Sequence, residues 1–551
     1  MELDISTLSR YLTPKRIFCT FLGLAVVKYR SFLYWPIYSW QSPLRHLNGP
    51  KNDNFFFGHF LKLLNEQSST MYEEWVEKYG KTFRFRGFVG SYQLYTMDMR
   101  AVQHMMTQSS IFDRPEATRR GMKLMFGEGL LSVDPAAHKR QRRIMNPSFG
   151  ALQIRNLLPV FWEKSNQLRD IWVDMLNNNP EGREVDVLAW LNRATLDVIG
   201  SAGFGYEFNS LQNEDEDEFA KAFKAMFSAS DAELTTMMMF EAVAYVVFGI
   251  PTKQSRKLNA LLDTIRRIGM KIIADKKAML NHDAKEDAEL QGRDLLTLLI
   301  KSNIAEETKG THENQSMSDN EVLGQITTFL AAGHETSGTA TAWALYTLTQ
   351  HIEVQNRLRH ELQSAGLGDE PSMADLDKLP YLDCVVRETL RVYSVVPNVG
   401  REVTIDTALP VGESYKDRYG VSQTEIRLQK GDNILVPILA MNRSKDIWGI
   451  DAMEFRPERW ENLPSSVKDM PGVWGNLMTF GNGAYSCIGY RFAVIEIKAL
   501  LYSLVQSIEF SIDPEIEIES KTGTIATRPY VKSDPKKGDR MPLRCKIVTS
   551  A

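Results

Sequence analysis

A single cysteine stands in a glycine-rich loop near the C-terminal end of the chain. In the segment FGNGAYSCIG, which runs from Phe480 to Gly489, three glycines surround Cys487. Glycine adopts positive φ readily and lets a flat ligand approach the backbone closely. The apolar stretch that follows is typical of a helix, and amides at a helix N-terminus favour a thiolate over a thiol. Such a cysteine can bind iron, and the alternative is an inert cysteine buried in a turn.

A second group of reactive residue types lies in the segment AAGHETSG at residues 331–338. This segment falls within a stretch that we expect to be one long helix, at about residues 320–350. Gly333, Glu335 and Thr336 combine a missing side chain, a carboxylate and a hydroxyl within one helical turn. Taken alone, the pattern also fits a helix kinked at a glycine, with a threonine bonded to its own backbone.

Charged residues form two further patterns. The segment ETLR places Glu388 and Arg391 three residues apart on one helix face, where they can pair, although such pairs are common on solvated surfaces. His138 and Arg142 are one helical turn apart in a basic segment, and an arginine suits a ligand that carries carboxylates. Three other cations near His138 are better explained as a basic surface face, which could dock an acidic electron donor: Lys139, Arg140 and Arg143.

A mainly helical body must position these residues. Up to Pro397, amphipathic helical patterns are separated by short breaks, and strands are expected within residues 81–97. Short strands and turns follow Pro397, up to the loop around Cys487. In the helix after that loop, one apolar face would pack beneath whatever the cysteine holds: Ile488, Phe492, Ile495, Ala499 and Tyr502. The predicted fold class is therefore mainly α, in an α+β arrangement.

Charge and cysteine usage exclude some function classes. The 551 residues include 65 basic and 69 acidic side chains and no extended basic tail, so we expect no nucleic acid as partner. The four cysteines lie far apart, without the spacing of a disulfide framework or a zinc site. A reducing compartment is the expected environment.

The N-terminal segment has the composition of a membrane anchor. An apolar run at residues 17–27 lies between basic residues and is followed by aromatic residues that favour a membrane interface. Because about 20 apolar residues are needed to cross a bilayer, the anchor either spans with its flanks or lies in the interface. A secretory signal would need a small-residue cleavage site, and a buried helix is the other alternative. We assign residues 1–41 to the anchor, 42–50 to a proline hinge and 51–551 to the soluble body.

The loop around Cys487 resembles the haem-binding pattern F-G-x-G-x-[RH]-x-C-x-G of the cytochrome P450 family at every position but one. The exception is Tyr485, where the family usually has an Arg or His that reaches a haem propionate. Three further motifs occur in the family's order, so the resemblance extends over nearly the whole chain from about Leu47. It implies the cytochrome P450 fold, a large helical bundle around haem with small β-sheets, behind an N-terminal membrane anchor.

The resemblance also implies a role for each candidate residue. Cys487 is expected to be the thiolate ligand to the iron of haem b. Thr336 is expected to hydrogen-bond oxygen as it is reduced, and Glu335 to relay protons. The expected cofactor-binding residues are His138, Arg142, Gly333, Arg401, Phe480, Tyr485 and Gly489, with Gly333 leaving room for dioxygen. A structural trio, Glu388, Arg391 and Arg459 of FRPERW, is expected to lock one helix to the loop that leads into Cys487.

The implied function is the insertion of one atom of O2 into a lipophilic small molecule. Electrons would come from NADPH through NADPH–cytochrome P450 reductase, with cytochrome b5 as a further donor. The likeness is to eukaryotic microsomal, in particular fungal, members, which implies the endoplasmic reticulum membrane with the catalytic domain on its cytosolic face and lipid as a partner. A terpenoid or steroid of secondary metabolism is the first choice of substrate, and a fatty acid or an aromatic xenobiotic is the alternative. Segments expected to line the substrate chamber are residues 114–128, 237–251, 329–333 and 396–399, and the second could equally be core or a membrane-dipping patch.

Two other classes compete with this function. A haem-thiolate isomerase or dehydratase would rearrange a hydroperoxide without a reductase, and the pair Gly333 and Thr336 argues against it. A haem-binding carrier or sensor would bind ligands without turnover.

Overall fold

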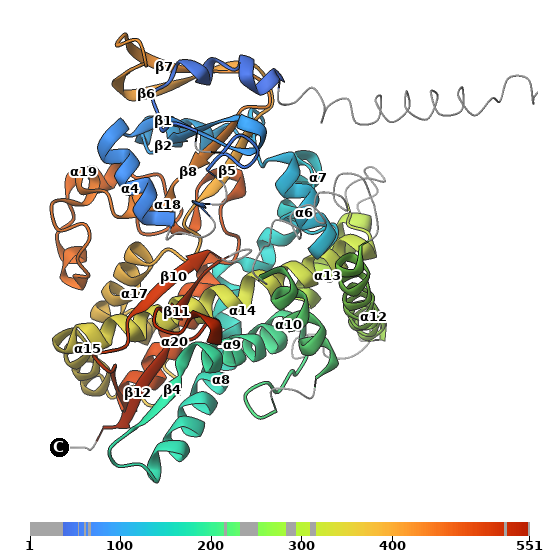
Figure 1. Cartoon of the computed structure of the whole chain (residues 1–551). Coiled ribbons are helices and arrows are strands. Elements are labelled where there is room, and N and C mark those ends of the chain that lie inside the picture. Colours follow the sequence, from blue (N-terminus) through green and yellow to red (C-terminus); the bar gives the residue numbers. More distant parts are fainter. Residues whose placement is uncertain are drawn as a thin grey trace, which may run out of the picture.

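Helices make up most of the chain between the N-terminal strands and the glycine-rich loop. The computed structural model describes residues 37–52, 54–59, 62–63, 68–213, 217–231, 252–282, 294–308, 316–522 and 526–548. Figure 1 shows the larger helices packed together in the lower part of the molecule, with most of the N-terminal strands above them. The mainly helical fold class predicted from the sequence is confirmed.

The elements run in the following order. The helices are α4 (Ser68–Tyr79), α5 (Met99–Thr107), α6 (Glu116–Phe126), α7 (Pro135–Met145), α8 (Ala151–Asn177), α9 (Val187–Val198), α10 (Glu218–Asp231), α12 (Lys253–His282), α13 (Leu295–Thr308), α14 (Asp319–Gln350), α15 (Ile352–Ser364), α16 (Met373–Leu376), α17 (Pro380–Val392), α18 (Ile438–Asn442), α19 (Lys445–Trp448) and α20 (Tyr490–Ser507). The strands are β1 (Thr82–Arg86), β2 (Tyr92–Thr96), β3 (Phe112–Asp113), β4 (Arg183–Asp186), β5 (Val399–Val403), β6 (Thr407–Lys416), β7 (Ser422–Leu428), β8 (Asn433–Val436), β9 (Ile508–Ser511), β10 (Ile518–Thr522), β11 (Thr527–Val531) and β12 (Pro542–Ile547).

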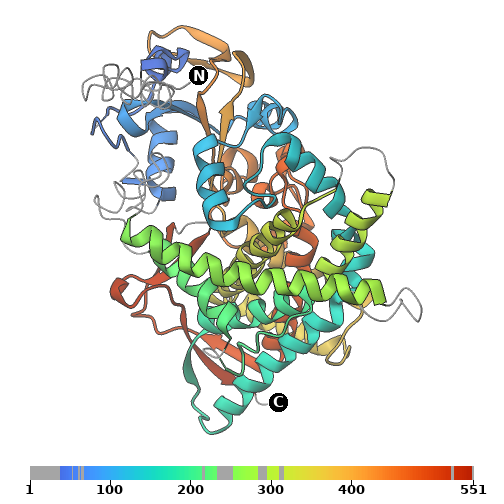
Figure 2. The same cartoon turned by 90° about the vertical axis from the view of Figure 1, so that its right-hand side faces the viewer.

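The long helix α14 runs through the middle of the molecule (Figure 1). Ser318 and Glu321 form a capping box that satisfies backbone amides at its start. Most of its residues are buried because α9, α12 and α20 pack around it. Figure 2 shows α12, in light green, lying across the face of the helical layer. The predicted helix at about residues 320–350 is confirmed.

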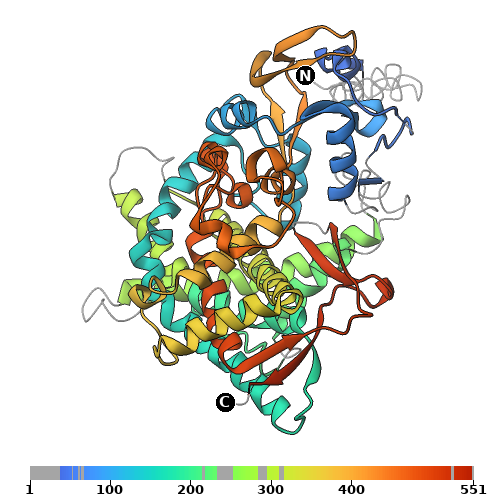
Figure 3. The same cartoon turned by 90° about the vertical axis from the view of Figure 1, so that its left-hand side faces the viewer.

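Among the described residues, the strands form one larger sheet and three small ones. The five-stranded sheet has the order β1-β2-β8-β5-β3, and β4-β12-β9 form a second sheet. The pairs β6–β7 and β10–β11 are antiparallel hairpins. The strands predicted within residues 81–97 are β1 and β2, and Figure 3 shows the C-terminal strands, in red, beside the helices. Pairing of β3 with β5 is the important step for the site, because it sets Asp113 opposite Glu402 and beside Arg401.

The segment predicted as a proline hinge, residues 42–50, packs against the body. It contains the short helix η1 (Pro43–His46), in which Leu44 is fully buried. The Arg84 amide donates to the Asn48 carbonyl at 2.9 Å, and the Asn48 side chain donates to the backbone beside β6. These contacts attach the segment to two parts of the fold.

Most of the predicted anchor lies outside the described residues, as does the whole segment 237–251. Among the residues that the structure describes, no helix is long and apolar enough to cross a membrane. The anchor therefore stays a prediction.

Candidate active site

Cys487 lies in a tight loop between the short helix η8 (Gly483–Tyr485) and α20. Gly481 and Gly483 have positive φ, as predicted, whereas Gly489 has φ −90° and precedes the first turn of α20. At Gly483 a Cβ would lie 1.9 Å from the carbonyl oxygen of Met106, in the last turn of α5. The Cys487 amide donates to the Phe480 carbonyl at 2.8 Å, which closes the loop. Glycine is required here because helix α5 approaches the loop so closely.

Cys487 is an exposed residue whose thiol nevertheless lies among protein atoms. It is exposed to solvent, yet desolvation by its neighbours raises the pKa of the thiol. The Gly489 amide and the Arg142 guanidinium lower this pKa, but desolvation outweighs them. The helix start therefore assists thiolate formation without achieving it alone, and a coordinated metal ion would complete the deprotonation.

Cations gather around Tyr485, two residues before this cysteine. We define the Tyr485 cluster as Tyr485 with Asp113, Arg114, His138, Arg142 and Arg401. The guanidinium carbons of Arg114 and Arg401 lie 4.5 and 5.3 Å from the centre of the Tyr485 ring. The His138 ring packs against the same ring with centroids 4.6 Å apart. Arg142 donates to the Ser486 carbonyl at 2.5 Å, so it lies beside the cysteine loop.

Two nitrogens of the Tyr485 cluster have no hydrogen-bond partner in the part of the chain that the structure describes. Within the described residues, His138 Nε2 and Arg401 Nε are buried and unpartnered. A second donor of Arg401 reaches only the Met106 sulfur, at 3.4 Å, and thioether sulfur is a weak acceptor. Buried donors without acceptors are costly, so the cluster is incomplete as it stands.

The charges of the Tyr485 cluster also oppose one another. Burial and then the charge of Arg401 lower the pKa of Arg114 to about 10. Burial, then Arg114 and Arg142, lower the pKa of His138 to about 3. An anionic ligand with two carboxylates would relieve both effects, because it would supply acceptors and opposite charge. Haem has two propionates, so the residues present fit this group.

Thr336 and Glu335 are both engaged within the protein. The Thr336 hydroxyl donates to the Ala332 carbonyl at 2.6 Å, which is the backbone bond that the motif alone suggests. Glu335 is buried, and Arg528 of β11 donates to its carboxylate at 2.5 Å. The proton-handling roles of Thr336 and Glu335 stay predictions.

Gly333 allows two helical segments to pack closely. A Cβ on Gly333 would lie 3.0 Å from the side chain of Ile199, in the π-helical stretch η4 (Ile199–Phe204) that follows α9. This contact gives a packing reason for the glycine, and the predicted space for dioxygen is not tested by it.

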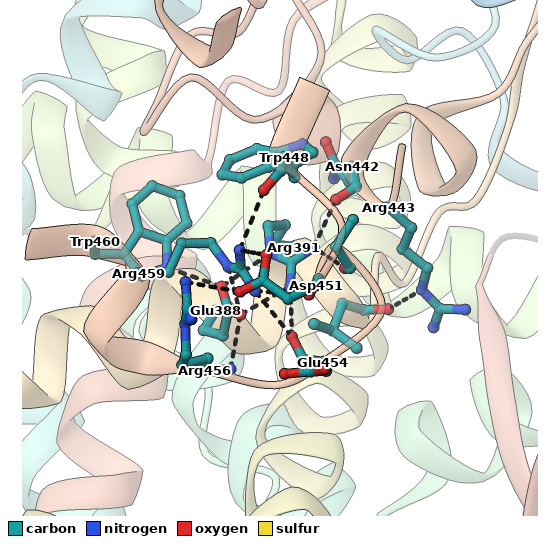
Figure 4. Close-up of polar contacts among 12 residues, drawn as sticks. Glu388, Arg391, Asn442, Arg443, Trp448, Asp451, Glu454, Arg456, Arg459 and Trp460 are labelled. Carbon is teal, nitrogen blue, oxygen red and sulfur yellow. Dashed lines mark hydrogen bonds and ion pairs between the residues drawn. The ribbon is translucent and has the colours of Figure 1, made fainter. Parts of the chain in front are cut away.

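A second group of charges, the Glu388 cluster, consists of Glu388, Arg391 and Arg459. All three are at most 2% exposed, which excludes a solvated helix pair. Arg391 makes five hydrogen bonds of 2.5 to 2.9 Å, two of them to the Glu388 carboxylate. Arg459 also makes five, including one to Glu388 Oε1 at 3.2 Å. Figure 4 shows Glu388, Arg391 and Arg459 together with the partners that the segment 442–460 supplies to them.

The Glu388 cluster connects α17 with the loop of Cys487. Asn442, whose carbonyl binds Arg391, donates from its side chain to Thr479 at 2.8 Å and accepts from the Met478 amide. The Thr479 hydroxyl in turn donates to the Leu390 carbonyl of α17. A continuous path of hydrogen bonds therefore joins α17 to the segment before Cys487.

Two of the three basic residues predicted as a surface face form ion pairs with glutamates. Lys139 and Arg143 are exposed, whereas Arg140 is mostly covered. Arg140 pairs with Glu321 of α14, and Arg143 pairs with Glu306 of α13 at 3.2 Å. Lys139 is thus the member of the three that best fits a solvated face.

A cleft of about 460 Å³ lies between α6, α12 and α14. Its apolar lining includes Phe126, Leu262, Ile265 and Leu323, and its polar lining includes Lys123, Asp263 and Arg266. Residues 123–128 line it, which lie within one of the segments expected at the substrate chamber.

Sequence reasoning missed two parts of the site. Asp113 and Arg114 join the Tyr485 cluster only because β3 pairs with β5, almost 290 residues later, as Asp113↔Glu402 shows. Arg528 approaches Glu335 through the packing of β11, 193 residues away. The sequence near Glu335 and Tyr485 contains no signal for these partners. The one local feature at Arg114 is the following Pro115, which favours extended backbone at the residue before it.

Comparisons with known proteins agree with this geometry. The family model described as Cytochrome P450 matches residues 48–532. The chain is 43% identical over 509 residues to Cytochrome P450 monooxygenase 205 of Postia placenta, covering 92% of this chain and 93% of the relative. It is 34% identical over 518 residues to Cytochrome P450 monooxygenase claP of Ampulloclitocybe clavipes, covering 91% and 93%. Ganoderic acid synthetase CYP5150L8 of Ganoderma lucidum is 30% identical over 517 residues, covering 89% and 93%.

Proposed function

Because this chain belongs to the cytochrome P450 family and is a cytochrome P450 monooxygenase, we propose that it inserts one atom of O2 into a lipophilic small molecule of fungal secondary metabolism. The second oxygen atom leaves as water, and two electrons come from NADPH through a reductase. The observation that supports this most is the accessible Cys487 in a glycine loop beside a cluster of cations with unpartnered donors.

The residues have distinct roles in this proposal. Cys487 is the thiolate ligand, and the haem that it holds supplies the activation of dioxygen. His138, Arg142 and Arg401 bind the propionates and so fix the plane of the cofactor. Thr336 holds a proton donor near the site of oxygen reduction, and Glu335 takes part in proton delivery.

The substrate class rests on the cleft and on the relatives. The cleft beside α14 is lined by apolar side chains together with charged ones, which suits an amphipathic or lipophilic molecule. One relative is named a ganoderic acid synthetase, which supports a product of secondary metabolism. We propose a terpenoid or steroid as the first class to test.

The location and redox partner follow from the N-terminal composition and the surface charge. We propose that residues 1–41 anchor the protein in the endoplasmic reticulum membrane with the catalytic domain in the cytosol. NADPH–cytochrome P450 reductase is the proposed donor, with cytochrome b5 as a second one. Deletion of residues 1–36, which retains the packed segment 42–50, should move the protein from the membrane pellet into solution with haem still bound.

Cys487→Ser tests the cofactor assignment. The variant should lose the red-shifted Soret band of the ferrous carbonyl complex completely, because that band requires thiolate ligation. Cys384→Ala is the matched control, since Cys384 lies on α17 and burial raises the pKa of its thiol to about 11. A thiolate-type spectrum in Cys487→Ser would exclude Cys487 as the ligand.

Turnover separates the competing functions. The wild type with reductase and NADPH should oxidise a member of a lipophilic panel that first shows a substrate-induced spin-state shift. Turnover of a hydroperoxide without NADPH would instead establish an isomerase or dehydratase. Ligand binding without any turnover across the panel would favour a carrier or sensor.

A further inference from the structure

Tyr485 joins a buried carboxylate to the cations that surround it. Its hydroxyl donates to Asp113 Oδ1 at 2.5 Å, and its ring contacts the guanidinium groups of Arg114 and Arg401. An arginine or histidine is usual at this position in the family that the loop resembles, and there the side chain itself carries the positive charge. In this chain a neutral phenol replaces that charge.

Asp113 is the carboxylate that this phenol restrains. It is only 4% exposed, so it needs donors to offset the loss of hydration. Asp113 Oδ1 accepts from the Tyr485 hydroxyl and from the Arg114 amide at 2.7 Å, and Oδ2 lies 3.4 Å from Arg119. The bond from Tyr485 is the shortest of the three.

The same carboxylate acts electrostatically on the two arginines beside Tyr485. Burial lowers the pKa of Arg114 and that of Arg401, and Tyr485 and then Asp113 oppose this effect at both arginines. Asp113 is therefore near enough to compete with any anion that these guanidinium groups bind. If its bond to the phenol were lost, the carboxylate would gain most by moving toward one of the two guanidinium groups.

We propose that Tyr485 is a positioning residue for haem: its hydroxyl holds Asp113 away from Arg114 and Arg401, so that both guanidinium groups remain available to the propionates. The unpartnered Arg401 Nε and the weak bond from Arg401 to Met106 are what an arginine kept available in this way should show. The inference rests on the proposed function, because it takes haem as the ligand of the cluster. It assigns to Asp113 and Tyr485 together the task that a single cation performs elsewhere.

A double-mutant cycle tests this role through haem loss. Tyr485→Phe keeps the ring and removes the hydroxyl, and it should accelerate transfer of haem to excess apomyoglobin by about tenfold, the loss expected for one charge-assisted hydrogen bond. Asp113→Asn removes the competing charge and should release haem no faster than wild type. In the Asp113→Asn background, Tyr485→Phe should have no further effect.

Tyr381→Phe is a matched control. Tyr381 also donates to an acid, Glu458 at 2.6 Å, and also carries a guanidinium, that of Arg357, 4.0 Å from its ring centre. It lies on α17, outside the Tyr485 cluster, so its loss should leave the rate of haem transfer unchanged.

Two results would overturn the inference. Equal acceleration by Tyr485→Phe in both backgrounds would mean that the hydroxyl binds a propionate directly. No acceleration in the wild-type background would mean that the hydroxyl does not position the cluster. Both differ from failure of the proposed function, in which the wild type itself would show no thiolate-type carbonyl spectrum.

Discussion

The Glu388 cluster and the Tyr485 cluster are both built from buried arginines, and they differ in how completely those arginines are bonded. In the Glu388 cluster, each of the five N–H donors of Arg391 has an acceptor within the protein. In the Tyr485 cluster, one nitrogen of Arg401 has no partner among the described residues, and the charges of Arg401 and Arg142 add to burial in lowering the pKa of Arg114. In these two clusters, the fully bonded Arg391 is placed to stabilise the fold, and the incompletely bonded Arg401 is placed to receive a ligand.

Arg391→Ala should have the largest effect, and it should act on the fold. Removing one member of a buried ion pair leaves Glu388 without its main partner, which typically costs about 3–5 kcal/mol. We expect a large fall in the urea concentration at the midpoint of unfolding, followed by far-UV circular dichroism, or failure to obtain folded protein.

A surface pair supplies the comparison for this variant. Lys378 pairs with Asp375 at 2.8 Å and is largely exposed, so Lys378→Ala should cost less than about 1 kcal/mol. If the two variants unfolded at the same urea concentration, the Glu388 cluster would not be a stabilising centre.

Arg401→Ala should act on haem and spare the fold. It removes a charge that repels Arg114 and that lacks a full set of acceptors, so folded protein should be obtained in normal yield. Loss of about 1.5–3 kcal/mol from a charge-assisted bond should speed haem transfer to apomyoglobin roughly tenfold to hundredfold.

The buried Arg359 is the control for this second variant. Like Arg391 it donates to backbone carbonyls, those of Val505 and Ile508. Arg359→Ala should lower the urea midpoint without a specific increase in the rate of haem transfer. The distinction between fully bonded and incompletely bonded arginines would be wrong if Arg401→Ala lowered the urea midpoint without faster haem transfer. It would also be wrong if Arg359→Ala accelerated haem transfer without lowering the urea midpoint.

Glu496 sharpens the comparison because it is an unpartnered acid on α20. Both its carboxylate oxygens are buried without a hydrogen-bond partner among the described residues, and burial raises its pKa to about 8, with Ser337 opposing. A raised folded-state pKa stabilises the fold at low pH, and this contribution is lost as pH rises from about 4.5 to 8. Glu496→Gln should therefore gain stability relative to wild type by roughly 1.4 kcal/mol per pH unit in that window.

The measurement for Glu496 is the difference in the free energy of unfolding between the two proteins at pH 5, 6, 7 and 8. A difference that does not change with pH would show that Glu496 is not kept protonated by the fold. It would then need a partner that neutralises its charge.

Thr336→Ala should have the smallest effect on the protein and a selective one on the reaction. The Thr336 hydroxyl already donates to the Ala332 carbonyl. Judged by this hydrogen bond alone, Thr336 would be a structural residue. The proposed role in proton handling predicts instead an unchanged haem spectrum and several-fold more peroxide per NADPH in the reconstituted system. If the amount of peroxide formed per NADPH were unchanged, Thr336 would be a structural residue, as its hydrogen bond to the Ala332 carbonyl alone suggests.

Local patterns in the sequence predicted the parts of the site that depend on neighbours along the chain. The turn at Gly481 and Gly483, the helix α14 and the pairing of Glu388 with Arg391 all follow from residues within a few positions of one another. The third member, Arg459, came from the family motif. The described residues place it against Glu388.

What could not be predicted depends on contacts between distant segments. Nothing near Tyr485 indicates Asp113, because their contact needs the β3–β5 pairing and the approach of α5 to the loop. The pairing of Glu335 with Arg528 likewise depends on where β11 packs. Sequence patterns identified the residues that could do chemistry, and tertiary packing decided which of their groups are left without partners.

The attachment of residues 42–50 has a consequence for orientation. Leu44 is buried and Asn48 bonds to both β1 and the β6–β7 hairpin, so this segment cannot swivel on the body. Whatever surface the preceding residues bind, the chain leaves the body at a fixed point. An anchor joined there would therefore restrict how the body is oriented relative to that surface. This restriction limits the directions in which the cleft between α6 and α12 can face the surface.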